Sequence, residues 1–350
     1  PVVDVQISRR GRNISISASQ RRFVYEHVVE HETEDMSLWH IPLSLSLKGV
    51  NEVKSTLLNT RESKIEITAG TAKQSWVKVN TGQTGFYRVN YSLEDWDKLR
   101  LAVEELELTP SDRLGIQNDA YALSKAGFLS VTQFLELTAG YVNDTDSYVW
   151  EDLAANLKSL DNILASEVFH PQFQEIARRI FRPVANRMGW TPKPNETHLE
   201  TLLRSTVLGE VGTYGDMQIL EQARSLFDIY SNNPDDVHPD IRKVVLNLTA
   251  KKADRAIYDR LWEMHEQTTL EEEKVRLLGA LTRVEQPSLL NETLEKSLSA
   301  SVRSHDSIRV VIGVASNHLG RDSAWEFVKA NWTEFYRRYG EGGFALMGLV

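Results

Sequence analysis

Residues 86–103 read FYRVNYSLEDWDKLRLAV, and the hydrophobic period of the chain changes within this stretch. Up to Tyr91, apolar and polar residues alternate, as they do along a half-buried β-strand. From Ser92 onward, Trp96, Leu99 and Val103 recur at the spacing of a helix, and Ser92 is a favoured N-cap residue. The sequence therefore predicts a domain boundary here, with a β-domain over residues 1–91 and a helical domain over residues 92–350.

Before this boundary the chain contains about seven short stretches with period two. The clearest is Trp39–Leu47, in which Ile41, Leu43, Leu45 and Leu47 alternate with polar residues. Short strands with turn residues between them are typical of a small all-β sandwich. Pro42 lies inside the best strand, which favours an edge position or a bulge for that strand.

After the boundary the helical period continues to the end of the chain. Segments such as 146–166, 171–188 and 321–338 are joined by short loops rich in Gly, Asn, Pro and Asp. A dozen helices in a row predict an all-α solenoid of the HEAT or armadillo type, with degenerate repeats. The fold class is thus α+β multidomain. The last residues, 342–350, are apolar and lack a cap, so we expect the helical domain to be truncated at its C-terminal end.

Composition excludes several classes of protein. The net charge of −9 and the absence of a basic stripe argue against nucleic acid and membrane surfaces as partners. No cysteine is present, which excludes disulfides and thiolate chemistry and favours a reducing, cytoplasmic location. The chain starts at Pro1 without a signal peptide or long apolar segment, so we expect it to begin inside a longer protein.

The asparagines support an alternative location. Seven Asn-x-Ser/Thr glycosylation signals occur, which favours a secretory or extracellular protein: Asn13, Asn90, Asn143, Asn195, Asn247, Asn291 and Asn331.

The best candidate for a catalytic motif is His27-Val28-Val29-Glu30-His31, which fits the inverted zinc-protease pattern H-x-x-E-H. That chemistry needs both imidazoles on one face of a helix, whereas this segment has the character of a strand. In an extended chain the two histidines would lie about 13 Å apart, too far for one zinc ion. The forward motif H-E-x-x-H is absent. We therefore predict no catalytic residue, metal site or cofactor in this chain.

Five segments, in order, resemble one family, the gluzincin zinc aminopeptidases, and the puromycin-sensitive type in particular. They are WHIPL at 39–43, TGFYRVNY at 84–91, DRLGIQND at 112–119, GW with HLETLLR at 189–204, and GRDSAWEF with NW at 320–332. The resemblance covers nearly the whole chain. It implies a four-domain parent enzyme that removes N-terminal residues from peptides with a zinc ion bound in a catalytic domain.

Within that parent, the resemblance implies that this chain is the non-catalytic C-terminal region, a monomer whose partners are the N-terminal and catalytic domains and peptide substrates. The helical domain would enclose the active-site cavity, with Asp161, Asn162, Ser316 and Asn317 facing it. Ser316 stands where antigen-trimming relatives carry a basic residue. A structural role is implied for the motif residues Tyr87, Arg88, Asp112, Arg113, Asn118 and Asp119.

Two other functions compete with this one. A free-standing helical scaffold for protein partners would explain the solenoid, but not the sandwich motifs in family order. A zinc protease of the inverted type would depend on His27 and His31 alone.

Overall fold

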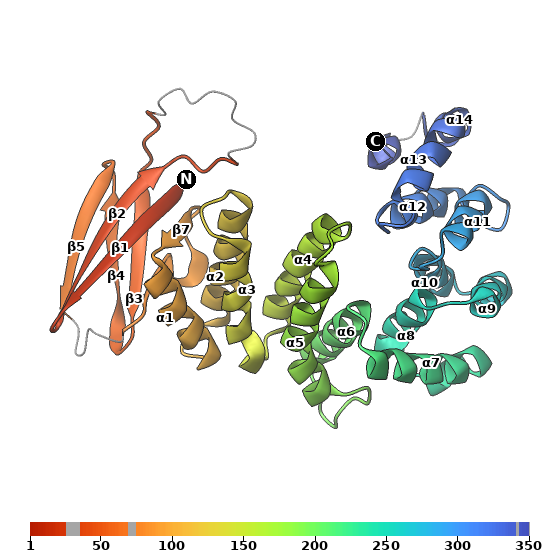
Figure 1. Cartoon of the computed structure of the whole chain (residues 1–350), viewed down its shortest axis with the longest axis horizontal. Helices are drawn as coiled ribbons and strands as arrows, with labels where there is room; N and C mark the ends of the chain where they lie inside the picture. The colour runs from red at the N-terminus through yellow and green to blue at the C-terminus, as the bar shows by residue number, and fades with distance from the viewer. Residues whose placement is uncertain (26–35, 69–74, 341–342, 350) are drawn as a thin grey trace. The chain divides into compact units, whose positions relative to one another are not determined.

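A computed structural model describes residues 1–25, 36–68, 75–340 and 343–349, and its strands lie within the first 91 residues (Figure 1). They form two sheets, with strand orders β5-β2-β1-β7 and β4-β3-β6, so the predicted β-sandwich is confirmed. The strands are β1 (Val2–Arg10), β2 (Asn13–Arg21), β3 (Ile41–Leu47), β4 (Val50–Leu58), β5 (Glu62–Thr68), β6 (Val77–Val79) and β7 (Arg88–Tyr91).

Alternation along the strands produces the core of the sandwich. Ile41, Leu43, Leu45 and Leu47 of β3 are buried, and the residues between them are more exposed. Side chains at every second position of a strand share one face, so a single strand supplies four core residues.

The strand that contains Pro42 was expected at an edge or a bulge. The edge position is wrong, because β3 is the central strand of its sheet. Its pairing with β4 does shift register between Leu45 and Leu47, as at a β-bulge. However, β6 pairs with Leu45–Leu47, so among the described residues β4 is the one neighbour of the end of β3 that carries Pro42. Proline lacks a backbone N–H and is tolerated where one neighbouring strand stops short.

Helices follow from Leu93 to Tyr339, in agreement with the predicted all-α region. They are α1 (Leu93–Glu104), α2 (Pro110–Lys125), α3 (Val131–Thr138), α4 (Ser147–Leu164), α5 (His170–Met188), α6 (His198–Thr213), α7 (Met217–Asn232), α8 (Pro239–Lys251), α9 (Arg255–Gln267), α10 (Glu271–Leu281), α11 (Pro287–Ser297), α12 (Ser304–Ala315), α13 (Arg321–Ala330) and α14 (Trp332–Tyr339). Short 3₁₀ segments include η2 (Thr81–Gln83) and η3 (Ala139–Asn143). In the described parts of the chain, no helix combines the length and apolar character needed to span a bilayer.

The predicted helix 321–338 is in fact two helices, which meet at Asn331. The Asn331 amide donates a hydrogen bond to the carbonyl of Phe327, 2.9 Å away. Asparagine side chains compete in this way with the backbone bonds of a helix, which explains the break.

The chain divides into two compact units, Pro1–Lys158 and Ser159–Val350. The first unit contains the sandwich and also α1, α2 and α3, although the change from strands to helices occurs at Tyr91–Leu93. The predicted limits 1–91 and 92–350 therefore describe where the secondary structure changes. That they are the limits of two independent domains stays a prediction.

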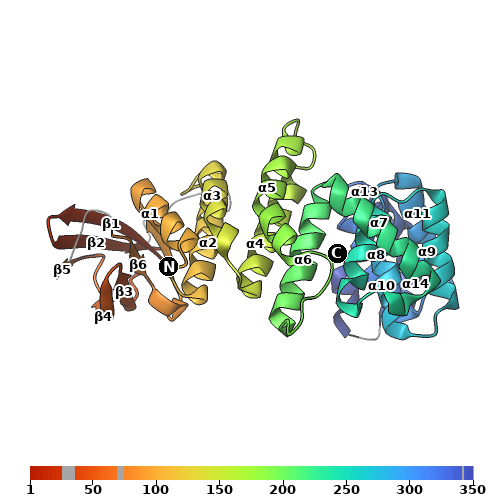
Figure 2. The same ribbon diagram turned by 90° about the horizontal axis from the view of Figure 1, so that it is seen from below.

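Helices of the second unit pack in consecutive pairs, α5 with α6, α7 with α8, α9 with α10, and α11 with α12. The second members, α6, α8, α10 and α12, form a row in which each contacts the next. Figure 2 shows the first pair, α5 beside α6. Stacked pairs of this kind bury a continuous core, which here extends from Phe227 to Leu349. The assignment to the HEAT or armadillo class stays a prediction.

Candidate functional site

Two of the sequence motifs meet in the first unit, where β7 contacts α2. Arg88 donates through Nη1 to the Asn118 side chain (2.8 Å) and to Asp119 Oδ1 (3.2 Å). The other oxygen of Asp119 accepts the backbone N–H of Val89 at 3.1 Å. Four residues of β7 and α2 thus connect the sandwich to the helices.

The N-terminal turn of α2 makes a second connection. Asp112 Oδ1 accepts the N–H of Gly82 at 2.7 Å and lies 3.6 Å from Lys78 Nζ. Lys78 also donates to the carbonyls of Val79 and Asn80, and its side chain is only 1% exposed. Burial lowers the pKa of Lys78, while the carboxylates of Asp112 and Asp119 oppose that shift. The charged groups of Lys78 and Asp112 are thus paired, as buried charges require.

The turn between β6 and β7 is held rigidly. Asn80 has a left-handed backbone (φ 61°), and its side chain bonds to the N–H and carbonyl of Gly85. Tyr87 follows and is buried, which raises its pKa to about 12. At Gly115 of α2, an added Cβ would lie 1.7 Å from the amide nitrogen of Gln83, so helix and turn are in direct contact.

Arg113 faces the other side of α2. Its guanidinium pairs with both oxygens of Asp144 (2.6 and 3.0 Å) and donates to the carbonyl of Leu108. Both side chains are buried, at 7% and 0% exposure. Arg113 therefore joins α2 to the loops at Leu108 and Asp144, whereas Arg88 and Asp119 join α2 to a strand.

One pH effect follows from Asp119. Burial raises its pKa to about 6, above the ordinary value of about 3.9. The folded chain therefore binds the Asp119 proton more tightly than the unfolded chain does. The resulting contribution to the free energy of unfolding is full below about pH 4 and is lost as the pH rises through about 6.

In the wild type, the free energy of unfolding should fall by about 2–3 kcal/mol across this pH range. Asp119→Asn keeps an oxygen acceptor but cannot ionise, so we expect this pH-dependent fall to be absent in the variant. Urea titrations at a series of pH values measure the slope. The exposed variant Asp97→Asn on α1 should keep the wild-type slope. An unchanged slope in Asp119→Asn would contradict the assignment.

The four predicted cavity residues lie in the second unit. Asp161 of α4 hydrogen-bonds His170 Nε2 at 2.6 Å, and its neighbour Asn162 is exposed. Ser316 ends α12 and donates to the carbonyl of Ile312. Asn317 donates to the carbonyls of Thr282 (3.2 Å) and Val284 (2.9 Å), so its amide is occupied in joining this turn to the end of α10.

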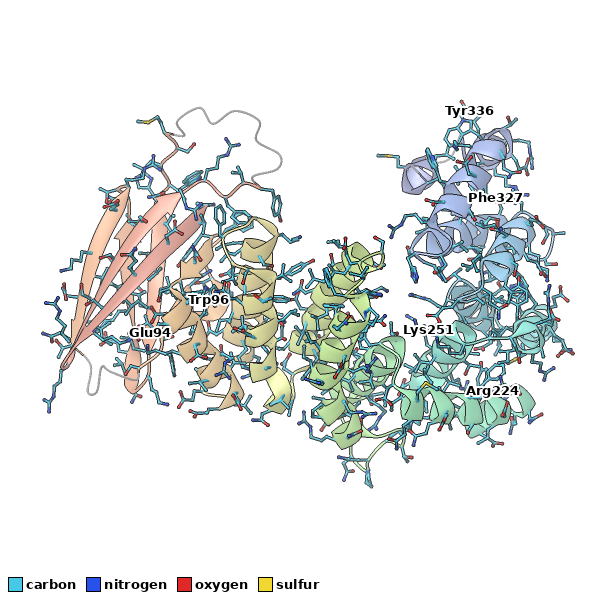
Figure 3. All side chains as sticks on the ribbon, in the orientation of Figure 1. Glu94, Trp96, Arg224, Lys251, Phe327 and Tyr336 are labelled. Atoms are coloured by element: carbon cyan, nitrogen blue, oxygen red, sulfur yellow. The ribbon has the colours of Figure 1, made fainter. Side chains whose placement is uncertain are left out.

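Four residues that the sequence did not single out lie in this neighbourhood: His318, which follows Asn317, and His170, Lys251 and Glu285, whose charges act on His318 together with that of Asp161. Burial lowers the pKa of His318, Lys251 and His170 add to this effect, and Glu285 and Asp161 oppose it. Lys251, labelled in Figure 3, pairs with Glu285 at 2.5 Å.

We call these five residues the His318 cluster. Asp161 belongs to α4 and His170 begins α5, while His318 directly follows the turn residues Ser316 and Asn317. The one feature of the sequence that could have pointed to this cluster was the position of His318 directly after Asn317. No local pattern pointed to His170 or Lys251.

Comparison with known proteins identifies the family. The family model described as ERAP1-like C-terminal domain matches residues 76–350. The chain belongs to this family. The prediction that it is the C-terminal part of an aminopeptidase is therefore confirmed.

Relatives of this ERAP1-like C-terminal domain are aminopeptidases. Aminopeptidase M1-A of Oryza sativa subsp. japonica is 30% identical over 95% of this chain and 38% of the relative. Puromycin-sensitive aminopeptidase of Caenorhabditis elegans is 26% identical over 97% of this chain and 36% of the relative. The thyrotropin-releasing hormone-degrading ectoenzyme of Rattus norvegicus is 29% identical over all of this chain and 34% of the relative. The chain thus spans little more than a third of these relatives.

A zinc ion is implied by the resemblance, and it would need at least three His, Asp or Glu donors in one place. Within residues 1–25, 36–68, 75–340 and 343–349 of this ERAP1-like C-terminal domain, no three His, Asp or Glu side chains are grouped to hold a metal ion. His27 and His31 lie outside the described residues. The described side chains do not fit a zinc site, and we derive no step through zinc from them.

Proposed function

We propose that this chain is the non-catalytic C-terminal region of a zinc-dependent aminopeptidase. The zinc ion and the bond-breaking chemistry would belong to a catalytic domain of the same parent protein. The helical region would border the cavity in front of that centre and restrict which peptides reach it. The partners would be the N-terminal and catalytic domains and the peptide substrate, in a monomeric enzyme.

The supporting observation is the His318 cluster. Asp161 and the turn at Ser316–Asn317 are far apart in the sequence, and the family resemblance implies that both face the cavity. In the second unit, His318 responds to the charges of Asp161 and His170. The influence of Asp161 on His318 supports the proposal that the two segments face one cavity.

The charges of the cluster indicate how it would treat peptides. Asp161 and Glu285 are acidic, Lys251 is basic, and Lys251 is already paired with Glu285. A neighbourhood with mixed charges does not provide a strong fixed site for a carboxylate, in agreement with the serine at position 316. We propose that it sorts peptides by access and weak charge effects.

Charge reversal at Asp161 tests this proposal in the full-length parent enzyme. Asp161→Lys should increase the rate ratio of long acidic peptides to dipeptide-sized substrates by about fivefold at low salt, because two units of charge change near the peptide. Hydrolysis of a single aminoacyl amide should stay within about twofold, since transition-state contacts are untouched. Steady-state kcat/KM values for both substrate classes give the ratio.

Matched variants separate charge from folding effects. Asp161→Asn keeps an oxygen acceptor for His170 and removes one unit of charge, where Asp161→Lys changes two. It should therefore change the logarithm of the rate ratio about half as much as Asp161→Lys does. Asp228→Lys, at an exposed side chain of α7, makes the same charge change outside the cluster and should leave the ratio unchanged. An equal loss of rate for the smallest substrate in Asp161→Lys would show that the helical region serves the chemistry itself.

For the parent protein we propose a cytoplasmic location, with a secretory location as the alternative. Asn13 and Asn195 are exposed, whereas Asn247 is half-buried within α8. A secretory protein would carry glycans at the exposed pair, and treatment with an N-glycosidase would then reduce its apparent mass.

A further inference from the structure

His265 is a buried titratable side chain of the second unit. It lies in the last turn of α9 and is 2% exposed. Its ring meets the Trp262 ring edge-on, with 5.4 Å between the ring centroids. Lys296 of α11 also lies over the Trp262 ring, with Nζ 4.7 Å from the ring centroid. The imidazole is therefore packed against an aromatic ring and kept away from water.

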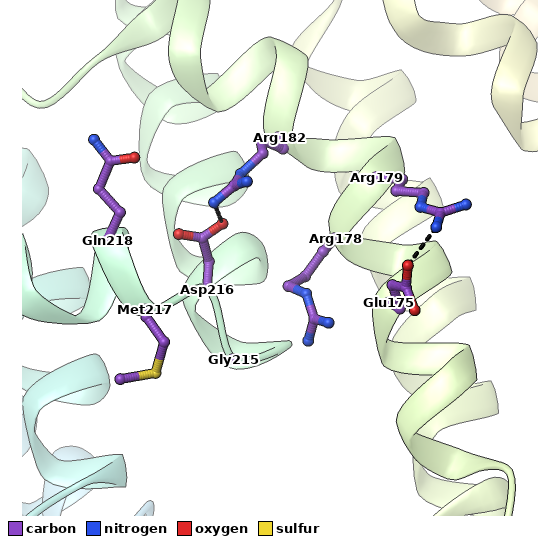
Figure 4. Close-up of a pocket in the computed structure, with 8 residues that line it drawn as sticks. All are labelled: Glu175, Arg178, Arg179, Arg182, Gly215, Asp216, Met217 and Gln218. Carbon is purple, nitrogen blue, oxygen red and sulfur yellow. Dashed lines mark hydrogen bonds and ion pairs between the residues drawn. The ribbon is translucent and has the colours of Figure 1, made fainter.

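Two other buried charges of this unit have ionic partners. Asp216, just before α7, pairs with Arg182 of α5 (Figure 4), and Arg204 pairs with Glu196. By contrast, Nδ1 of His265 has no hydrogen-bond partner within the part of the chain that the structure describes. A neutral imidazole has one donor and one acceptor nitrogen, whereas both nitrogens of an imidazolium donate. Protonation would therefore add a positive charge to a ring whose Nδ1 has no acceptor.

The surroundings of His265 disfavour its protonated form. Burial lowers the pKa of His265, and the positive charges of Lys274 in α10 and Arg303 before α12 add to this effect. The carboxylates of Glu266 and Asp306 act in the opposite direction. However, Glu266 is exposed, so water and salt screen its charge. Asp306 is already paired with Arg303, 2.7 Å away.

We propose that His265 is a pH-sensitive switch of the second unit, whose protonation in mildly acidic solution loosens the packing of α9 against α10. These two helices are in direct contact. The ring would take up its proton when α9 moves away from its neighbours and water reaches the imidazole, so acid would favour the opened form. The inference does not depend on the role proposed for the helical region.

The expected pH dependence has the opposite sign to that of Asp119 in the first unit. The opened form binds the His265 proton more tightly than the closed form does. The contribution of His265 to the closed form is therefore full well above about pH 6.5, the ordinary value for histidine, and is lost as the pH falls below it. A measurement on the chain must accordingly resolve α9 and α10 from the first unit.

Hydrogen exchange of the whole 350-residue chain, analysed by mass spectrometry of its peptides, tests the proposal. Protection factors of the amides in α9 and α10 should fall by up to about tenfold between about pH 7.5 and about pH 5.5, the limit set by an ordinary histidine in the opened form. His265→Gln cannot ionise, so its fall should be less than about twofold. His198→Gln, at an exposed histidine that begins α6, is the matched control and should fall as the wild type does.

A second measurement on the wild type covers the case in which His265→Gln does not fold. Slow deuterium exchange at the ring carbon Cε1 depends on protonation of the imidazole, and it gives the titration midpoint of His265. A midpoint below that of the same histidine in a synthetic α9 peptide supports the proposal, and an equal or higher midpoint overturns it. The proposal is also overturned if wild-type protection in α9 and α10 falls less than about twofold, or if the full fall persists in His265→Gln.

Discussion

Replacing Arg113 with Met is expected to lower the free energy of unfolding of the first unit by about 3–5 kcal/mol. Asp144, which is fully buried, would lose both hydrogen bonds from the guanidinium, and the Leu108 carbonyl would lose its donor. A buried carboxylate without its partner costs far more than an ion pair contributes in water. Urea unfolding would give the loss, and hydrogen exchange of α2 amides would locate it in this unit.

Arg100→Met is the matched control for this variant. Arg100 lies on α1 and forms ion pairs with the exposed side chains of Asp97 and Glu104. Pairs of this kind contribute about 1 kcal/mol or less. If Arg113→Met were no more destabilising than Arg100→Met, the pair with Asp144 would not be a structural element of α2.

Replacing Arg204 with Met should destabilise the second unit by a similar amount, about 3–5 kcal/mol. Arg204 of α6 has no exposed side-chain area, pairs with Glu196, and donates to the carbonyls of Met188 and Gly189 at the end of α5. The last carbonyls of a helix have no partner within it, so this arginine satisfies them and holds the link between α5 and α6. The backbone amides between α5 and α6 should also lose protection against hydrogen exchange in this variant.

Arg204→Lys distinguishes geometry from charge. Lysine keeps the positive charge but lacks the planar fork that reaches a carboxylate and two carbonyls together, so we expect it to recover only part of the loss. On α7, Arg224 forms an exposed i,i+4 pair with Asp228, and Arg224→Met should change stability by less than about 1 kcal/mol. Full recovery by Arg204→Lys would show that the charge alone matters.

The type of each element followed from local residues, because strand and helix leave different hydrophobic periods in the sequence. The strand at Ile41–Leu47 and the helix after Ser92 were predicted for that reason. The central position of β3 was not, since the neighbours of a strand lie elsewhere in the chain. The break at Asn331 was also missed, because a single hydrogen bond to Phe327 decides between one helix and two, and periodicity does not register it.

The residues of the candidate site could not be predicted from hydrophobic period. Asp161 and Ser316–Asn317 were predicted through resemblance to a family and not from their own chemistry, and their role in contacting peptides stays a prediction. His170 and His318 were isolated histidines in the sequence. Their electrostatic relation to Asp161 depends on how successive helix pairs stack, and stacking is set by packing over the whole unit.

The sequence by itself determined a sandwich followed by helices, and family motifs in an order that identified the chain as part of an aminopeptidase. Both conclusions rest on residues that are close together in the sequence: the fold class on hydrophobic period, and the family on short motifs. Only the tertiary structure decided that Arg88 and Asp112 join strands to α2, and that the charges of Asp161, His170, Lys251 and Glu285 act on His318 after α12. Those relations join residues from different elements. Their energies depend on burial and on distances of a few ångströms, which no local pattern in the sequence records.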